Sequence, residues 1–379
     1  NVAIVLDKSG SMTGEKSKHA KEAAIMAIRR LRKDDIVSVV VYDTTVNVLV
    51  PATKLSNKES IANTIRSINA GGNTALFAGV SRGANEVRKF LAKNRVNRVI
   101  LLSDGLANVG PSAPSDLAEL GDSLGREGIS VTTIGLGLGY NEDLMTQLAM
   151  RSDGNHMFAE TPVELAGVFD AEFGDVLAVV AQDVEVTIDF DERVRPVRGL
   201  GREVDIAGQR ATARLNQLYA GQMKYVLVEV ELPAYAGEAL LRSSLTPIAN
   251  VDVAYANMKT ESPDRIRKQV AVRLTAEPDK AQKSINKEIM ASAVEQIALE
   301  KNRWALRLRD EGKIEEARKA LLSNRDYLHS NAITLNNEEL KQQAVTNEVD
   351  AQNLDPEAWT RQRKVMRSNQ YRVMKQQAE

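Results

Sequence analysis

Short apolar runs alternate with helical stripes over the first part of the chain. Four runs are rich in β-branched residues and nearly free of charge, at residues 2–6, 36–42, 96–103 and 129–136. Strands buried on both faces of a parallel sheet have this composition. Between the runs, apolar residues return every three or four positions, as at Ile61, Ile65 and Ile68, which predicts helices that cover the sheet. Residues 1–177 are therefore predicted to form an α/β domain with a doubly wound, mostly parallel, Rossmann-like sheet, with residues 46–50 as an antiparallel edge strand.

The pattern changes to a period of two between residues 178 and 276. Apolar residues alternate with polar ones around Val186, Val228 and Val272. Turn signals separate these segments, at Gly199, Gly201, Gly208, Gly221 and Gly237. Strands with one buried and one solvated face alternate in this way, so this region is predicted to be an antiparallel β-sandwich.

Charged, alanine-rich sequence with few glycines fills residues 277–379 and predicts a helical region. Two segments with helical periodicity, residues 285–308 and 314–328, flank the turn signal around Gly312, which predicts an antiparallel helical hairpin. The last segment, residues 356–379, carries six Lys or Arg and two Glu. We interpret this basic C-terminal segment as a solvated helix face, in preference to a phosphate-binding tail.

The composition indicates a folded protein without an overall charge bias. The 379 residues are 43% hydrophobic and 27% charged, with a formal net charge of -1. A chain of this length usually forms more than one domain, and balanced charge gives no general attraction to nucleic acid or to an anionic membrane. The chain has no cysteine, so it has no disulfide and no thiolate metal site. No apolar run predicts a membrane span, and we expect that a signal or further strands upstream of Asn1 were removed.

Side chains with oxygen donors are concentrated after the predicted strands. Asp7, Ser9 and Ser11 follow the first strand at alternate positions, in the stretch DKSGSM. Thr74 comes after two glycines and before a predicted helix, and Asp104 follows the strand that ends in LLS. The carboxyl ends of parallel strands meet at one edge of a sheet, where ligands of such folds gather. These five side chains are therefore predicted to converge.

Two carboxylates and three hydroxyls suit a hard divalent cation. Mg²⁺ prefers six oxygen ligands at about 2.0–2.1 Å and keeps several waters, and Ca²⁺ or Mn²⁺ are alternatives. The two carboxylates neutralise the ion, whereas the hydroxyls add no charge. A position left to water thus stays electrophilic and can accept a carboxylate from outside.

These residues closely resemble the metal-ion-dependent adhesion site (MIDAS) of von Willebrand factor A (VWA) domains and integrin inserted domains. D-x-S-x-S, the threonine loop and the aspartate after the later strand each lie in the expected loop, and the resemblance covers residues 1 to about 177. The order of this domain and a β-rich domain is similar to inter-alpha-trypsin-inhibitor heavy chains and calcium-activated-channel-like bacterial VWA proteins.

The resemblance implies a non-enzymatic binding protein whose metal captures a Glu or Asp carboxylate of a protein partner. The implied metal ligands are Asp7, Ser9, Ser11, Thr74 and Asp104. Side chains at the rim would set the specificity, and we expect them to be Met12, Asn73 and Asn108. Adhesive relatives imply a secreted, cell-surface or periplasmic protein, with a cytoplasmic location as the alternative.

Two other functions stay open. In the first, the chain is a scaffold or assembly component whose sandwich and helices bind the partner, while the metal site regulates. In the second, the metal activates water in a phosphohydrolase. The sequence disfavours hydrolysis because His19, His156 and His329 lie in separate regions, with no general base near the motif. The glycines at 135, 137 and 139 lack the spacing of a dinucleotide site.

Overall fold

The computed structural model describes residues 1–232 and 245–377, so the turn predicted at Gly237 lies outside the described residues. The chain divides into two compact units. The first contains Asn1–Gln182 with two short later segments, Asn216–Gln222 and Ala256–Ser262. The second contains the other described residues. The division into three domains, with boundaries near residues 177 and 276, stays a prediction.

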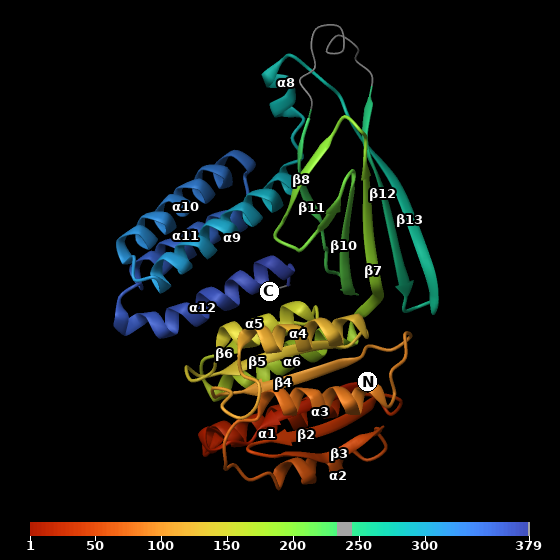
Figure 1. Ribbon diagram of the computed structural model, residues 1–379, viewed down its shortest axis with the longest axis vertical. Helices are drawn as coiled ribbons and strands as arrows, with labels where there is room; N and C mark the ends of the chain where they lie inside the picture. Colours follow the sequence, from red (N-terminus) through yellow and green to blue (C-terminus); the bar gives the residue numbers. More distant parts are fainter. Residues whose placement is uncertain (233–244, 378–379) are drawn as a thin grey trace. The chain divides into compact units, whose positions relative to one another are not determined.

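A six-stranded, mostly parallel sheet forms the centre of the first unit (Figure 1). Its order is β3-β2-β1-β4-β5-β6, with β1 (Val2–Asp7), β2 (Ile36–Tyr42), β3 (Val46–Lys54), β4 (Arg98–Ser103), β5 (Ser130–Leu136) and β6 (His156–Ala159). β3 pairs antiparallel with β2 at the edge, as predicted, and the other neighbours pair in parallel. Because β1 has β2 on one side and β4 on the other, the carboxyl ends of β1 and β4 form the crevice in which such folds bind ligands.

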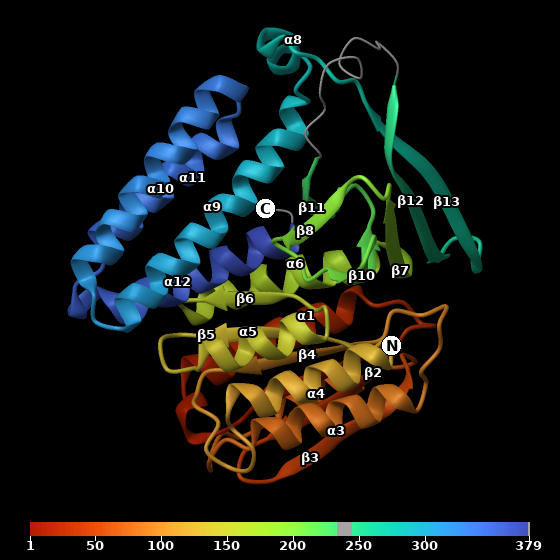
Figure 2. The same ribbon diagram turned by 45° about the horizontal axis from the view of Figure 1, so that its top comes forward.

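Helices cover both faces of this sheet, which confirms the doubly wound architecture. Val2, Ile4 and Leu6 point into a core shared with α1 (Glu15–Arg30), α2 (Lys58–Arg66) and α6 (Leu165–Leu177). Ala3 and Val5 point into the other core, shared with α3 (Leu76–Arg88), α4 (Pro114–Arg126) and α5 (Glu142–Arg151). Figure 2 shows these last three helices together on one face. Two single 3-10 turns, η1 (Gly10–Met12) and η2 (Pro162–Glu164), precede α1 and α6.

Antiparallel sheets follow, as the period of two predicts. One has the order β13-β12-β7-β10-β9, and β11 pairs with β8 in the other. The strands are β7 (Val179–Phe190), β8 (Arg195–Leu200), β9 (Asp205–Ala207), β10 (Arg210–Tyr219), β11 (Leu227–Glu231), β12 (Thr246–Asn257) and β13 (Ser262–Val272). Along β10, every second residue from Ala211 to Tyr219 is buried, so this strand packs on one face only.

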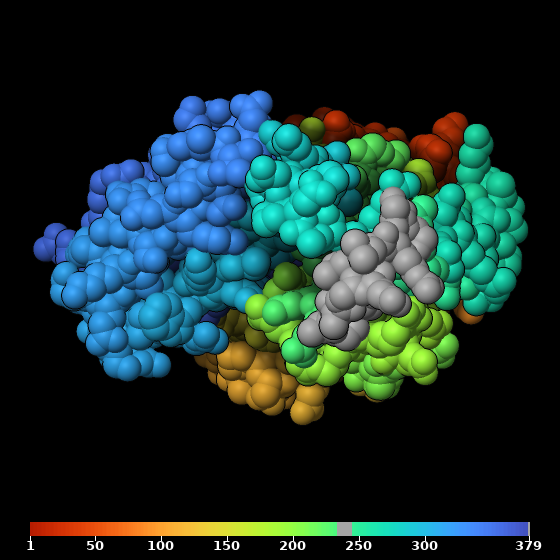
Figure 3. Space-filling model, turned by 90° about the horizontal axis from the view of Figure 1, so that it is seen from above, coloured from red at the N-terminus to blue at the C-terminus, as the bar shows by residue number. Residues whose placement is uncertain are grey.

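The helices of the second unit are α8 (Pro278–Lys283), α9 (Lys287–Asp310), α10 (Ile314–Leu335), α11 (Glu338–Gln352) and α12 (Pro356–Lys375). α9 and α10 form the predicted hairpin, with Gly312 at the turn in a left-handed conformation (φ 81°). In the space-filling view the residues of α10, α11 and α12, in blue, form one continuous part of the surface (Figure 3). The basic segment in α12 is more than a solvated face, because Met366, Tyr371 and Met374 are buried. Among the described residues, no helix has the length and apolar character needed to cross a bilayer.

Candidate metal centre

Three loops meet at the carboxyl edge of the sheet in the first unit. Asp7 ends β1, and Asp104 directly follows β4, its parallel neighbour. The loop after β1 is joined to the loop that precedes α3 by two backbone hydrogen bonds. The N–H of Gly10 donates to the carbonyl of Gly72 at 2.9 Å, and that of Gly71 donates to the carbonyl of Lys8 at 2.7 Å. The backbone therefore holds these two loops together before any side chain contributes.

The hydroxyls and one carboxylate form a chain of contacts at this edge. Ser9 Oγ lies 3.1 Å from Ser11 Oγ, and Ser11 Oγ donates to Asp104 Oδ1 at 2.6 Å. Ser9 and Asp104 are buried, whereas Ser11 is exposed. One end of the cluster thus faces solvent, where a ligand can reach it.

Asp7 is oriented by groups on both sides. Its Oδ1 accepts the backbone N–H of Ser9 at 2.8 Å, and its Oδ2 accepts the hydroxyl of Ser103 at 2.8 Å. Burial raises the pKa of the Asp7 carboxyl, although these hydrogen bonds oppose the rise. A desolvated carboxylate of this kind gains from a nearby cation. Ser103 was not assigned a role from the sequence, although it directly precedes Asp104.

Thr74 is the fifth oxygen donor, and its hydroxyl lies beside Gly105 together with that of Ser11. A Cβ atom at Gly105 would lie 3.3 Å from Ser11 Oγ and 3.5 Å from Thr74 Oγ1. Both hydroxyls therefore border the same small space above residue 105. The backbone N–H of Thr74 donates to Asn108 Oδ1 at 2.8 Å, which links this loop to the loop after β4.

The donor set fits a hard cation. It consists of oxygen atoms alone, from two carboxylates and three hydroxyls, which is the ligand chemistry that Mg²⁺ and Ca²⁺ prefer. Within residues 1–232 and 245–377, no three His, Cys, Asp or Glu side chains are grouped in a way that could hold a metal. A metal at this edge would therefore depend on the hydroxyls as well as on the carboxylates.

Two lysines beside the motif form ion pairs that the sequence analysis missed. Lys16 Nζ lies 2.5 Å from Asp104 Oδ2, and Lys8 pairs with Asp43. Lys16 is in the first turn of α1, and Asp104 is 88 residues further along the chain. No sequence spacing connects the members of such a pair.

The expected rim is only partly at the surface. Asn73 and Asn108 are exposed. Met12 is 1% exposed and belongs to the core beneath the sheet edge, so the expectation that it contacts a partner is wrong. It ends the 3-10 turn Gly10–Met12, whose hydrogen bond from Met12 N–H to the Ser9 carbonyl turns the residue inward.

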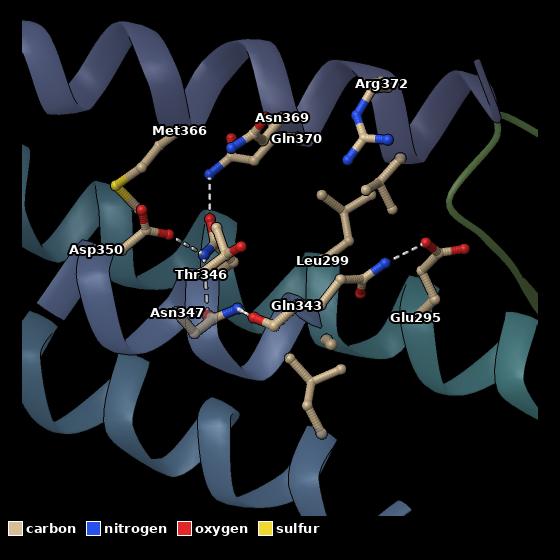
Figure 4. A pocket seen from close by; sticks show the side chains of 14 residues that line it. Glu295, Leu299, Gln343, Thr346, Asn347, Asp350, Met366, Asn369, Gln370 and Arg372 are labelled. Atoms are coloured by element: carbon tan, nitrogen blue, oxygen red, sulfur yellow. Dashed lines mark hydrogen bonds between the residues drawn. The ribbon is translucent and has the colours of Figure 1, made fainter. Parts of the chain in front are cut away.

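A second polar region lies inside the helices of the second unit. Side chains of α9, α11 and α12, with Leu328 of α10, surround a cavity of about 70 Å³ (Figure 4). Asn347 Oδ1 accepts hydrogen bonds from Asn302 and Asn324 at 3.0 Å each. Asp350 accepts hydrogen bonds from Asn302 and from Gln362. These amides largely satisfy one another, as a polar layer that fixes the register of packed helices does.

Oxygen donors from three loops at the carboxyl edge of a doubly wound sheet are the arrangement expected of a VWA domain, and the sequence comparison gives the same family. Residues 1–171 match the von Willebrand factor type A domain family. The chain therefore carries a VWA domain, and domains of this type are typically metal-dependent protein-binding modules.

Similar proteins occur in bacteria and animals. The chain is 29% identical to the uncharacterized protein YfbK of Escherichia coli over 206 residues, which are 54% of this chain and 36% of YfbK. It is 26% identical to human inter-alpha-trypsin inhibitor heavy chain H3 over 239 residues, which are 58% of this chain and 26% of that protein. The matches thus span well under half of either relative.

The fold as a whole also has a counterpart among solved structures. A von Willebrand factor type A protein from Catenulispora acidiphila superposes with a TM-score of 0.74 over 98% of this chain and 88% of that chain. Because the sequence identity is 16%, this similarity concerns the fold alone.

Proposed function

We propose that the first domain binds one divalent cation, Mg²⁺ in the first place, and captures an acidic side chain of a protein partner through it. The observation that carries the proposal is the chain of contacts from Ser9 through Ser11 to Asp104, together with the Ser11 and Thr74 hydroxyls that border the space above Gly105. The proposed ligands are Asp7, Ser9, Ser11, Thr74 and Asp104. The bound cation would supply an electrophilic position for the partner's carboxylate.

The surroundings of the site favour binding over hydrolysis. His19 lies beside Glu15 and Glu22 on α1, and His156 Nδ1 is hydrogen-bonded to Thr133 Oγ1 at 2.8 Å inside the sheet. Lys8 and Lys16, which do lie near the loops, are each paired with a carboxylate. A general base needs a free lone pair within reach of a water molecule, and none of these four groups offers one at the site. We therefore propose a recognition module and no enzyme.

The exposed end of the site is the proposed docking position. Ser11, Asn73 and Asn108 are exposed, and a carboxylate that approaches from solvent meets this side first. We further propose that the protein acts on a bacterial surface, in the periplasm or after secretion, where millimolar divalent cation is available.

Calorimetric titration of Mg²⁺, Mn²⁺ and Ca²⁺ into EDTA-treated protein tests the proposal. Asp7→Asn keeps an acceptor for the Ser9 N–H and removes the charge, so it is expected to lose metal binding while its thermal unfolding in EDTA changes little. Asp170→Asn is the matched control. Asp170 is an exposed residue of α6 that pairs with Arg30 at the end of α1, away from the site. Equal metal affinity in Asp7→Asn and wild type would refute the assignment.

The scaffold alternative makes a different prediction about partners. If the β-rich and helical regions bind the partner, then capture from a bacterial extract is unaffected by EDTA and by Asp7→Asn. If the metal bridges the two proteins, both treatments abolish capture, whereas Asp170→Asn does not.

A further inference from the structure

A lysine side chain lies against one of the proposed metal ligands. Lys16 Nζ is 2.5 Å from Asp104 Oδ2, while the other oxygen, Oδ1, accepts the hydroxyl of Ser11 at 2.6 Å. The Asp104 side chain is fully buried, and that of Lys16 is 34% exposed. One oxygen of Asp104 therefore faces the proposed metal position, and the other is held by an ammonium group.

The loops leave room for this lysine. A Cβ atom at Gly137, in the loop after β5, would have Lys16 Nζ as its nearest neighbour, at 3.9 Å. Gly139, two residues on, comes so close to the Asp104 carbonyl that a Cβ atom there would lie 2.8 Å from its oxygen. The loop after β5 thus packs on Asp104 at Gly139 and lies beside Lys16 at Gly137. The ion pair between Lys16 and Asp104 therefore lies where α1, the loop after β4 and the loop after β5 meet.

Lys16 changes the charge of the site. Asp7 and Asp104 contribute two negative charges, and Lys16 removes one of them, whereas Lys8 is balanced by Asp43. Without Lys16, a divalent cation would make the site neutral. With Lys16, the loaded site keeps one positive charge. Charges at short range interact strongly where protein excludes water, so this difference acts on both the cation and its anionic ligand.

We propose that Lys16 sets the balance between the two binding steps: it weakens the binding of the metal and strengthens the capture of a carboxylate by the loaded site. This inference rests on the proposed metal site, and it assigns to one residue opposite effects on metal and on ligand. A residue that merely held the loops in place would weaken both steps when removed.

Titration of Mn²⁺ into the full chain tests the first effect. Lys16→Gln is expected to bind Mn²⁺ about tenfold more tightly than wild type, which corresponds to about 1.4 kcal/mol. Lys16→Arg keeps the charge and is expected to stay close to wild type. Lys18→Gln is the matched control, because Lys18 is on the same helix but pairs with Glu15.

Acetate serves as the probe for the second effect. The water-proton relaxation of Mn²⁺-saturated protein falls when acetate displaces water from the ion, and this fall gives an acetate affinity. Lys16→Gln is expected to bind acetate about tenfold more weakly than wild type, which again corresponds to about 1.4 kcal/mol. Lys16→Arg and Lys18→Gln are expected to match wild type.

The outcomes separate this inference from the proposed function. If wild type binds no metal, or Asp7→Asn binds as well as wild type, the metal site itself is refuted. If wild type binds Mn²⁺ and Asp7→Asn does not, but Lys16→Gln leaves the Mn²⁺ affinity unchanged or weakens it, only the role of Lys16 is refuted.

Discussion

Asp350 is predicted to make the packed helices of the second unit, α9 to α12, less stable at neutral pH than in mild acid. Its side chain is 2% exposed, in the polar layer of α11. Asn302 Nδ2 donates to its Oδ2 at 3.2 Å and Gln362 Nε2 donates to its Oδ1 at 2.6 Å, and both donors are neutral. Burial raises the pKa of the Asp350 carboxyl from 3.8 to about 6, although the two amides oppose the rise.

The sign and size of the effect follow from linkage. Since the folded state binds the proton more tightly than the unfolded state, the stabilisation by protonated Asp350 is fully present below pH 3.8 and is lost as the pH rises through about 6. Each pKa unit corresponds to about 1.4 kcal/mol, so ionisation of Asp350 costs the folded state about 2–3 kcal/mol at pH 7. Asp350→Asn carries no such cost at any pH.

Chemical unfolding of the full chain between pH 4 and pH 7.5 measures this difference. Trp304 and Trp359 are the two tryptophans of the sequence, and they lie in α9 and α12, so their fluorescence reports on the helical unit. The unfolding free energy of Asp350→Asn minus that of wild type is expected to rise by about 2–3 kcal/mol from pH 4 to pH 7. Asp326→Asn is the control, because it changes an exposed aspartate paired with Arg325. Its unfolding free energy minus that of wild type is expected to be the same at pH 4 and pH 7.

A pH-independent difference for Asp350→Asn would refute this reasoning. It would mean that the two amide donors compensate the buried charge in full, and that the carboxyl titrates at its ordinary pKa in the folded protein.

Two further substitutions test other parts of the first unit. Arg98→Met leaves the carboxylate of Glu172 buried without its ion pair and is expected to cost about 3–5 kcal/mol of stability; Arg98→Met with Glu172→Gln should recover part of this loss in thermal unfolding, and an equal loss in both would argue against the ion pair. Gly105→Ala puts a methyl group between Ser11 Oγ and Thr74 Oγ1 and is expected to weaken Mn²⁺ binding about tenfold or more. Unchanged calorimetric affinity in Gly105→Ala would show that the space above residue 105 is not used by the metal.

The strands and helices with strong apolar patterns could be predicted from the sequence, and the others could not. The strands β1, β2, β4 and β5 are buried along their whole length, and a short uninterrupted apolar run is typical of a strand covered on both faces. β6 is only four residues long and contains His156, a polar residue that is buried and hydrogen-bonded to Thr133. α11 turns Asn347 and Asp350 inward, so its buried face is partly polar. A search for apolar stripes overlooks both elements.

The candidate site was accessible to sequence reasoning as far as topology fixes it. Asp7 ends one strand and Asp104 directly follows its parallel neighbour, and the carboxyl ends of such strands lie at the same edge of the sheet. Topology does not determine whether a side chain in these loops points to solvent or into the core. Met12 directly follows Ser11, but the 3-10 turn sends one residue outward to solvent and the next into the core. That Met12 is next to Ser11 in the sequence therefore does not predict that Met12 is exposed at the site.

Lys16 and Arg98 escaped prediction because long charged side chains take their partners from the tertiary structure. Arg98 reaches Glu172, which is 74 residues away in the sequence. For Lys16 the helix itself holds a usable signal. A cation in the first turn of a helix is unfavourable, and Lys16 has Met12, Thr13, His19 and Ala20 at helical neighbour positions, none of them acidic. Lys18, by contrast, has Glu15 three residues before it. A lysine in the first turn without a local acidic partner, next to a predicted cation site, implies a carboxylate from another loop, and in this fold Asp104 is that carboxylate.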